Sequence, residues 1–322
     1  MFKKTVSVIF FVCAFFCFSS CQNKNNSEKL NKNISISLTS DASVLSVIGL
    51  KNKSDENLTR NKYEFSFFSN NIEVLANIAN GKCDIAFLPV DLSAILYNKT
   101  NGKILVYSVN SLNNLYLLSY DSDIHSILDL KDKTVVILKK DLNLNPVASI
   151  LIKKNNIENV TIKIVNDEKD LLSGDTKNLN IVLTEPDCTK IFKTLNLKDL
   201  KIINLEREWE KISNNHPLPS SCLVVRKSFY KKNKSVFENF ILDYSESCQF
   251  SNNDITKASF LAREFFNLDE ENLKNSIAKC NLTNITGKKM VSMLKNFLTI
   301  LYSEDPELIG SKLPLEDFYI KD

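Results

Sequence analysis

Residues 71–99 read NIEVLANIANGKCDIAFLPVDLSAILYNK and contain the clearest structural pattern in the chain. Apolar residues at helical spacing predict a helix over 71–80, which Gly81 ends. The next segment, Cys83–Leu88, is a short and mostly apolar run that predicts a buried strand. Pro89-Val90-Asp91 then predicts the start of a second helix, which runs to Lys99. A buried strand between two helices is typical of α/β proteins with largely parallel sheets.

The same alternation of strands and helices continues on both sides of this unit. Because single cores stop growing at roughly 250–300 residues, a chain of 322 residues favours two lobes. We expect residues 34–110 and 223–322 to form the first lobe and residues 111–222 the second. The chain would cross near Asn110–Leu115 and return near Pro219–Cys222. Further strands are expected at Ile34–Leu38, Tyr63–Phe68, Lys103–Val109, Leu115–Ser119, Thr134–Leu138, Val160–Val165, Leu179–Thr184 and Ser221–Arg226. Further helices are expected from Thr39-Ser40-Asp41 to about Leu50 and at Asn145–Asn155, Asp167–Leu172 and Pro186–Leu195.

The C-terminal third of the chain reads as helical. Its apolar residues fall at helical spacing, which predicts core packing. The last stretch, Leu313–Tyr319, is expected to be a loop whose two aromatic residues dock on the body. The single tryptophan, Trp209, lies in a polar stretch. Packing against the second lobe is favoured for it over stacking on a ligand ring.

The N-terminus has the pattern of a secretory signal. A basic start, Met1–Lys4, precedes the apolar segment Thr5–Phe18, which is too short to span a bilayer. The segment ends in Phe18-Ser19-Ser20-Cys21, which resembles a bacterial lipobox. We therefore expect residues 1–20 to be a signal peptide, Cys21 to be lipidated, and residues 21–33 to form a flexible polar tether. The alternative is an ordinary signal with an incidental cysteine.

Composition excludes several functional classes. The formal charge of +3 falls to +1 without Lys3 and Lys4, so there is no electrostatic footprint for nucleic acid. The six glycines are scattered, which excludes phosphate-cradling and dinucleotide-binding loops. No metal-binding spacing occurs, so we expect neither metal nor cofactor. The cysteines after Cys21 are flanked mostly by apolar residues and are expected to be buried; they are Cys83, Cys188, Cys222, Cys248 and Cys280.

The candidate binding residues lie at the junctions where strands end and helices begin. In open α/β sheets, ligands bind beyond the carboxyl ends of the strands. Taken singly, these residues could serve only as helix caps, but several polar junctions facing one cleft favour a binding site. An acidic residue there would oppose an anion and accept hydrogen bonds from an amine or pyrimidine N–H. The candidates are Thr39, Ser40, Asp41, Pro89, Val90, Asp91, Asn110, Ser111, Asn145, Glu185 and Pro186.

Several stretches of the sequence resemble a known protein family. Residues 81–89 (GKCDIAFLP) followed by 96–99 (LYNK) resemble a stretch of ABC-transporter solute-binding proteins of the nitrate/sulfonate/taurine and thiamine-pyrimidine-precursor type. Other stretches fit in the same order, and together they cover nearly all of the chain after the signal; they are 114–117, 129–134, 185–186, 223–226, 309–314 and 317–319.

The resemblance implies an α/β, two-lobed type 2 periplasmic-binding-protein fold with an inter-lobe cleft. It implies a monomeric binding protein, not an enzyme, that captures a small polar or anionic solute (sulfonate, nitrate or pyrimidine-like). Its partners would be ABC permease and ATPase subunits, and it would sit outside the cytoplasm, anchored to a bacterial membrane through Cys21. Family ligand contacts match Thr39, Ser40, Asp41, Pro89, Val90, Asn145, Glu185 and Pro186.

Two alternatives stay open. The chain departs from the family at Asp41-Ala42-Ser43, where small residues are usual, and at residues 141–145, where a Gly/Thr-rich loop is usual. These departures suggest a surface lipoprotein that keeps the fold but binds a protein or cell-surface partner. Related fungal pyrimidine synthases are enzymes that need a reactive histidine. Neither His125 nor His216 lies at a predicted junction, which argues against catalysis.

Overall fold

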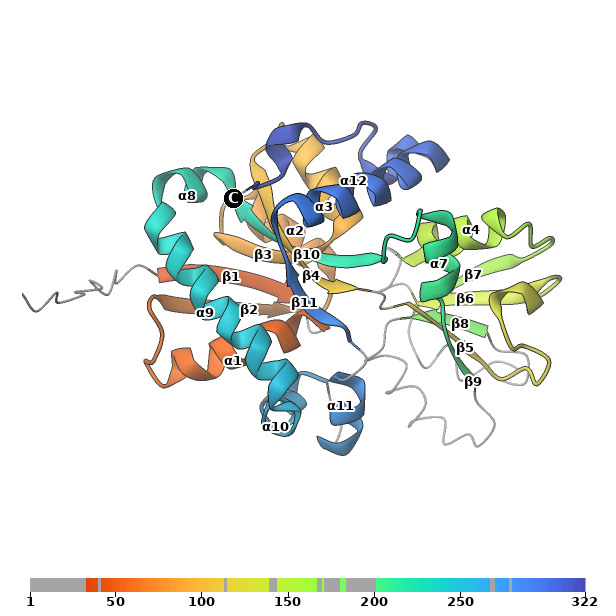
Figure 1. The fold of residues 1–322 in the computed structure, drawn as a ribbon, viewed down its shortest axis with the longest axis horizontal. Coiled ribbons are helices and arrows are strands. Elements are labelled where there is room, and N and C mark those ends of the chain that lie inside the picture. The colour runs from red at the N-terminus through yellow and green to blue at the C-terminus, as the bar shows by residue number, and fades with distance from the viewer. Residues whose placement is uncertain are drawn as a thin grey trace, which may run out of the picture.

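The computed structural model describes residues 33–39, 42–112, 115–138, 144–166, 170, 180–183, 201–266, 270–277 and 280–321. Two mixed sheets with helices packed around them build two lobes, which are joined by extended strands (Figure 1). The first sheet has the strand order β11-β4-β10-β3-β1-β2, and the second has the order β7-β6-β8-β5-β9. This architecture confirms the predicted α/β class.

In the first sheet, β1 lies between β2 and β3 and runs parallel to both. Strand β10 lies between β3 and β4 and runs antiparallel to both. The sheet is therefore complete only once the chain has returned from the second lobe. Its strands are β1 (Asn33–Thr39), β2 (Lys62–Phe68), β3 (Ile85–Pro89), β4 (Ile104–Leu112), β10 (Pro219–Arg226) and β11 (Leu282–Ile285).

Helices cover both faces of this sheet because its strands are apolar on both sides. One face packs on α1, α9 and α10, and the other on α2, α3 and α12. The helical elements of this lobe are α1 (Ala42–Asp55), α2 (Asn71–Ala79), α3 (Val90–Lys99), α8 (Lys227–Lys232), α9 (Lys234–Asn253), α10 (Ile255–Phe266), α11 (Glu270–Ile277), α12 (Gly287–Glu304), η4 (Pro306–Ile309) and η5 (Glu316–Phe318).

The second sheet combines a parallel and an antiparallel half. Strand β6 runs parallel to β7 and β8, while β5 runs antiparallel to β8 and β9. Helices α4 and α7 pack against each other beside it. The elements of this lobe are β5 (Tyr116–Ser119), η1 (Ile127–Leu130), β6 (Thr134–Leu138), α4 (Leu144–Lys154), β7 (Thr161–Val165), β8 (Asn180–Leu183), β9 (Lys201–Asn204) and α7 (Glu206–Ile212).

Two residues of the stretch 71–99 hold the first lobe together. The Asp84 carboxylate accepts hydrogen bonds from the backbone N–H of Ser35 (3.2 Å) and from the Arg226 guanidinium (2.5 Å), which ties β1 and β10 to the start of β3. Asn98 Nδ2 donates to the carbonyls of Ile309 (2.7 Å) and Lys312 (2.6 Å), which fixes the C-terminal segment on α3. Much of the motif that carries the family resemblance is therefore structural.

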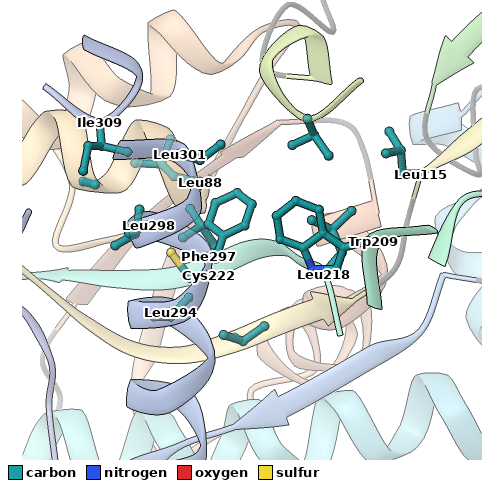
Figure 2. Packing of buried hydrophobic residues seen from close by; sticks show 14 of the residues in the cluster. Leu88, Leu115, Trp209, Leu218, Cys222, Leu294, Phe297, Leu298, Leu301 and Ile309 are labelled. Carbon is teal, nitrogen blue, oxygen red and sulfur yellow. The ribbon is translucent and has the colours of Figure 1, made fainter. Parts of the chain in front are cut away.

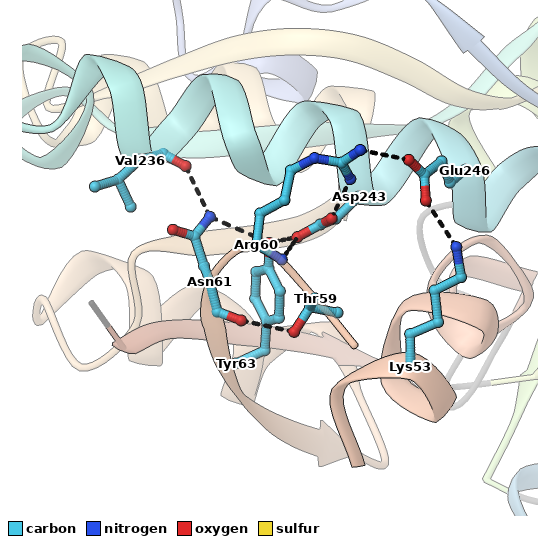
Figure 3. A network of polar contacts seen from close by, with 8 residues as sticks. All are labelled: Lys53, Thr59, Arg60, Asn61, Tyr63, Val236, Asp243 and Glu246. Atoms are coloured by element: carbon cyan, nitrogen blue, oxygen red, sulfur yellow. Dashed lines mark hydrogen bonds and ion pairs between the residues drawn. The ribbon is translucent and has the colours of Figure 1, made fainter. Parts of the chain in front are cut away.

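A polar network ties the loop between α1 and β2 to helix α9 (Figure 3). Asp243 is 3% exposed and accepts hydrogen bonds from the Tyr63 hydroxyl (2.6 Å) and from the backbone N–H of Arg60 (3.0 Å). The Arg60 guanidinium forms ion pairs with both Asp243 and Glu246. Burying a carboxylate removes it from water at a large cost in free energy, and partners such as these offset that cost. The network therefore fixes the edge strand β2 on the lobe.

The two lobes share one apolar core at their junction (Figure 2). Trp209 of α7 is fully buried, and its ring lies 5.5 Å from the Phe297 ring of α12, measured between centroids. Leu115 and Leu218, on the two connections between the lobes, belong to the same cluster. Packing against the second lobe was expected for Trp209; its ring is buried, but the ring contact is with Phe297 of the first lobe. Among the described helices, none is long and apolar enough to cross a membrane.

Most predicted strands are confirmed within a few residues. The structure also contains β9, α7 and β11, which were not expected. Strand β10 begins at Pro219, earlier than predicted, and the C-terminal aromatics Phe318 and Tyr319 are buried as expected. Cys83, Cys222, Cys248 and Cys280 are buried, as predicted. Of the helix expected at 167–172 the structure describes only Asp170, which is helical; the helix expected at 186–195, Cys21 and Cys188 lie outside the described residues.

Candidate functional site

The carboxyl ends of β1, β3 and β4 meet the amino end of β10 at one edge of the six-stranded sheet. Ser221 of β10 pairs with Pro89 of β3 on one side and with Ser111 of β4 on the other. The next strand along is β1, which ends in the buried Thr39. We call this region the strand-end edge; it comprises Thr39, Pro89–Asp91, Asn110–Ser111 and Pro219–Ser221.

A chain of hydrogen bonds links the side chains of this edge. The Ser221 hydroxyl donates to Asn110 Oδ1 at 2.9 Å, so the Ser111 hydroxyl, 2.8 Å from Ser221 Oγ, donates to Ser221. Asn110 is fully buried. Its Nδ2 has no hydrogen-bond partner among the described residues. Because a buried unpaired N–H group costs about 1–3 kcal/mol, this amide is a candidate donor to a ligand.

Asp91 adds a buried carboxylate to the edge. Pro89 is the N-cap residue of α3, and Asp91 is in the first turn, 8% exposed. Burial raises its pKa to about 7, although hydrogen bonds from its own backbone N–H and that of Leu92 act in the opposite direction. Within the described part of the chain, Asp91 forms no ion pair. The side chain therefore changes charge near neutral pH.

Ser93 and Cys222 fix the start of α3 against β10. The Ser93 hydroxyl donates to the Pro89 carbonyl at 3.0 Å, and its oxygen lies 3.2 Å from Cys222 Sγ. Burial raises the pKa of the Cys222 thiol to about 12. At neutral pH this thiol is protonated, so it is a packing group rather than a nucleophile.

The structure brings together six candidates at the end of the six-stranded sheet, namely Thr39, Pro89, Val90, Asp91, Asn110 and Ser111. Pro89 is the last residue of β3 rather than the first residue of the helix, which begins at Val90. In the second lobe, Asn145 lies in the first turn of α4, where Ser149 Oγ donates to its Oδ1 at 3.3 Å. The remaining candidates, Ser40, Asp41, Glu185 and Pro186, lie outside the described residues.

Sequence reasoning missed Ser221 as a site residue. The sequence predicts an extended run from Ser221, but the position of Ser221 between Pro89 and Ser111 depends on the strand order, which no local pattern reveals. A pair of serines at the amino end of a returning strand was the available signal. Across the described residues, no group of three histidine, cysteine or acidic side chains could hold a metal ion. His125 is exposed.

Comparison with known proteins places this geometry on a known fold. By sequence, no family model matches the chain, and no curated protein matches it. Among solved structures, a Parabacteroides distasonis protein described as an ABC transporter is 18% identical, with a TM-score of 0.72 and coverage of 90% of this chain and 99% of its own. The periplasmic aliphatic sulphonate binding protein of Escherichia coli is 10% identical, with a TM-score of 0.72 and coverage of 89% and 92%.

A third similar structure comes from Candida albicans. It is described as defining a new family with the generic periplasmic binding protein structural fold, and it is 11% identical, with a TM-score of 0.58 and coverage of 88% and 98%. At such identities the likeness shows the fold alone. This chain has the periplasmic-binding-protein fold, and the solved structures that it resembles include ABC-transporter binding proteins, as the resemblance in residues 81–99 predicted.

Proposed function

We propose that this protein is the solute-binding component of an ABC importer and captures one small polar solute at the strand-end edge. The observation that carries the proposal is the convergence of polar groups where the chain passes between the lobes: Asp91, Asn110 and Ser111 are buried, and Ser221 is half-buried. In open α/β sheets this is the end of the sheet where ligands bind. Named ABC-transporter binding proteins with the same fold support this role.

In this proposal the two lobes enclose the solute in a cleft, and the protein binds without chemical turnover. One lobe would contain the six-stranded sheet and the other the five-stranded sheet. The division expected at 110/111 and 222/223 then moves by a few residues, because β4 runs to Leu112 and β10 begins at Pro219 in the six-stranded sheet. Asn145, Glu185 and Pro186 would contribute from the second lobe, opposite the strand-end edge. The protein would act as a monomer outside the cytoplasm, held at a bacterial membrane by the lipidated Cys21, and would pass its solute to a permease and ATPase.

Thermal unfolding with a panel of solutes tests the proposal. A ligand at 100 times its dissociation constant adds about 2.7 kcal/mol to the free energy of unfolding, which raises the melting temperature by several degrees. The panel includes alkyl sulfonates, nitrate, hydroxymethylpyrimidine, amines and amino acids. Ser221→Ala should reduce the shift. Ser247→Ala is the control, because the Ser247 hydroxyl also takes part in a hydrogen bond, accepting from the backbone N–H of Leu50, but in another part of the lobe.

A second function is favoured by one observation. The family usually has small residues where this chain has Asp41-Ala42-Ser43, and larger side chains restrict close backbone approach to a solute. A lipoprotein that keeps the fold but binds a protein or cell-surface partner would tolerate this change. It predicts no thermal shift with any solute and a stable complex with a partner protein.

A further inference from the structure

Two buried side chains at the strand-end edge have hydrogen-bonding capacity that the described residues leave unused. Asp91 is 8% exposed, and its carboxylate accepts from backbone N–H groups of the first turn of α3. A carboxylate has about four lone-pair sites, so acceptor capacity remains. Asn110 is fully buried, and its Nδ2 finds no acceptor within the described part of the chain. The Asp91 carboxylate can therefore accept a further hydrogen bond, and Asn110 Nδ2 can donate one.

A short series of contacts connects these two groups. Asp91 lies two residues after Pro89, which pairs with Ser221 across β3 and β10. The Ser221 hydroxyl donates a hydrogen bond to Asn110 Oδ1 at 2.9 Å. The Nδ2 atom of the same amide has no partner among the described residues. A donor-seeking carboxylate and an acceptor-seeking amide thus flank the same strand end. This pairing limits the kind of solute that can satisfy both.

The charge at this edge is negative or neutral. Among the described residues of the strand-end edge and of the neighbouring strand ends, 68–70 and 281–282, there is no lysine or arginine. Within the described part of the chain, the Cys222 thiol interacts electrostatically with Asp91, and this thiol is protonated at neutral pH. An anionic solute would face the Asp91 carboxylate with no described cation to offset the repulsion.

We infer that the solute presents a basic nitrogen, as an amine or amidine-type N–H, to Asp91 and an acceptor atom to Asn110 Nδ2. The solute class is a small nitrogen compound that also carries a carbonyl oxygen or ring nitrogen, rather than a simple sulfonate or nitrate anion. This inference rests on the proposed function. It differs from the sulphonate specificity in the name of the Escherichia coli protein, which shares only the fold.

Titration calorimetry of the full-length protein with matched pairs of probes tests the inference. Each pair differs only at the nitrogen: glycinamide and glycolamide, 4-aminopyrimidine and 4-methylpyrimidine, taurine and isethionate. We expect the nitrogen compound of at least one of the first two pairs to bind at least tenfold more tightly than its partner. Asp91→Asn should remove this preference, whereas Ser247→Ala should preserve it.

The outcomes separate this inference from the function on which it rests. If isethionate or nitrate binds as tightly as the nitrogen compounds, or more tightly, the inference is overturned while the solute-binding function stands. A nitrogen preference that survives in Asp91→Asn would also overturn it. Binding of none of the probes or anions by folded protein would overturn both. Because Asp91→Asn is nearly isosteric, circular dichroism is expected to show a folded variant.

Discussion

Replacing Asp91 by asparagine is expected to stabilise the ligand-free protein at alkaline pH. Burial raises the pKa of the folded-state carboxyl from 3.8 to about 7. A group whose pKa is raised by folding stabilises the folded state while it is protonated, and that stabilisation is lost as the pH rises through the folded-state pKa. Wild-type protein should therefore lose stability between pH 5 and pH 8, and the variant should lose less.

The size of the effect follows from the same pKa values. One pKa unit corresponds to about 1.4 kcal/mol. Between pH 5 and pH 8, the folded carboxyl would release its proton while the unfolded one stays ionised, so wild type should lose about 3 kcal/mol relative to Asp91→Asn. Denaturant unfolding at the two pH values measures this difference. Ser247→Ala, which removes no titratable group, should keep the wild-type pH dependence.

The reasoning about Asp91 fails if the two proteins show the same change with pH. A difference below about 1 kcal/mol would mean that the carboxyl is ionised across this range. It would then have a cationic partner that the described residues do not include. A measured difference of about 3 kcal/mol would show that the ionised Asp91 carboxylate lowers the stability of the ligand-free protein. A solute that brings a basic nitrogen to this carboxylate would then raise the stability again.

Three other perturbations test separate parts of the structure. Trp209→Ala should destabilise the protein by about 3–5 kcal/mol and separate the unfolding of the two lobes in calorimetry, because the lost ring packs on Phe297 across their junction; a single unchanged transition would argue against a shared core. Asp243→Asn should cost about 1–3 kcal/mol in urea unfolding, since the carboxylate accepts the Tyr63 hydroxyl at 2.6 Å, and a neutral effect would mean that the loop is fixed by packing alone. Cys21→Ala should abolish incorporation of labelled palmitate and leave the protein in the soluble fraction, whereas continued labelling would place the lipid elsewhere.

The sequence predicts the local elements well because helix and strand periodicities are local. Residues 71–99 are an example: their helix, strand and second helix are all confirmed. Strand β11, by contrast, reads Leu-Thr-Asn-Ile and has no apolar alternation; it is the edge strand of its sheet, and its partner among the described strands is β4. Such a strand forms because a partner is present, which no local pattern encodes.

The candidate site could be predicted only in part for the same reason. Strand ends can be read from the sequence, so Asp91 and Asn110 were found. The hydrogen bond from Ser221 to Asn110 depends on β10 entering between β3 and β4 after the excursion through the second lobe. Likewise, the pKa of Asp91 depends on burial by distant segments, and burial of one residue is a tertiary property.

Native mass spectrometry tests the central claim, one captured solute per chain, most directly. Full-length protein is incubated with a small-molecule extract of bacterial cells and then compared with an Asn110→Leu, Ser221→Ala double variant. We predict one additional small mass per chain on the wild type, with fragmentation that releases a basic nitrogen, and none on the variant. A bare chain in both samples, or the same added mass on both, would contradict solute capture at the strand-end edge.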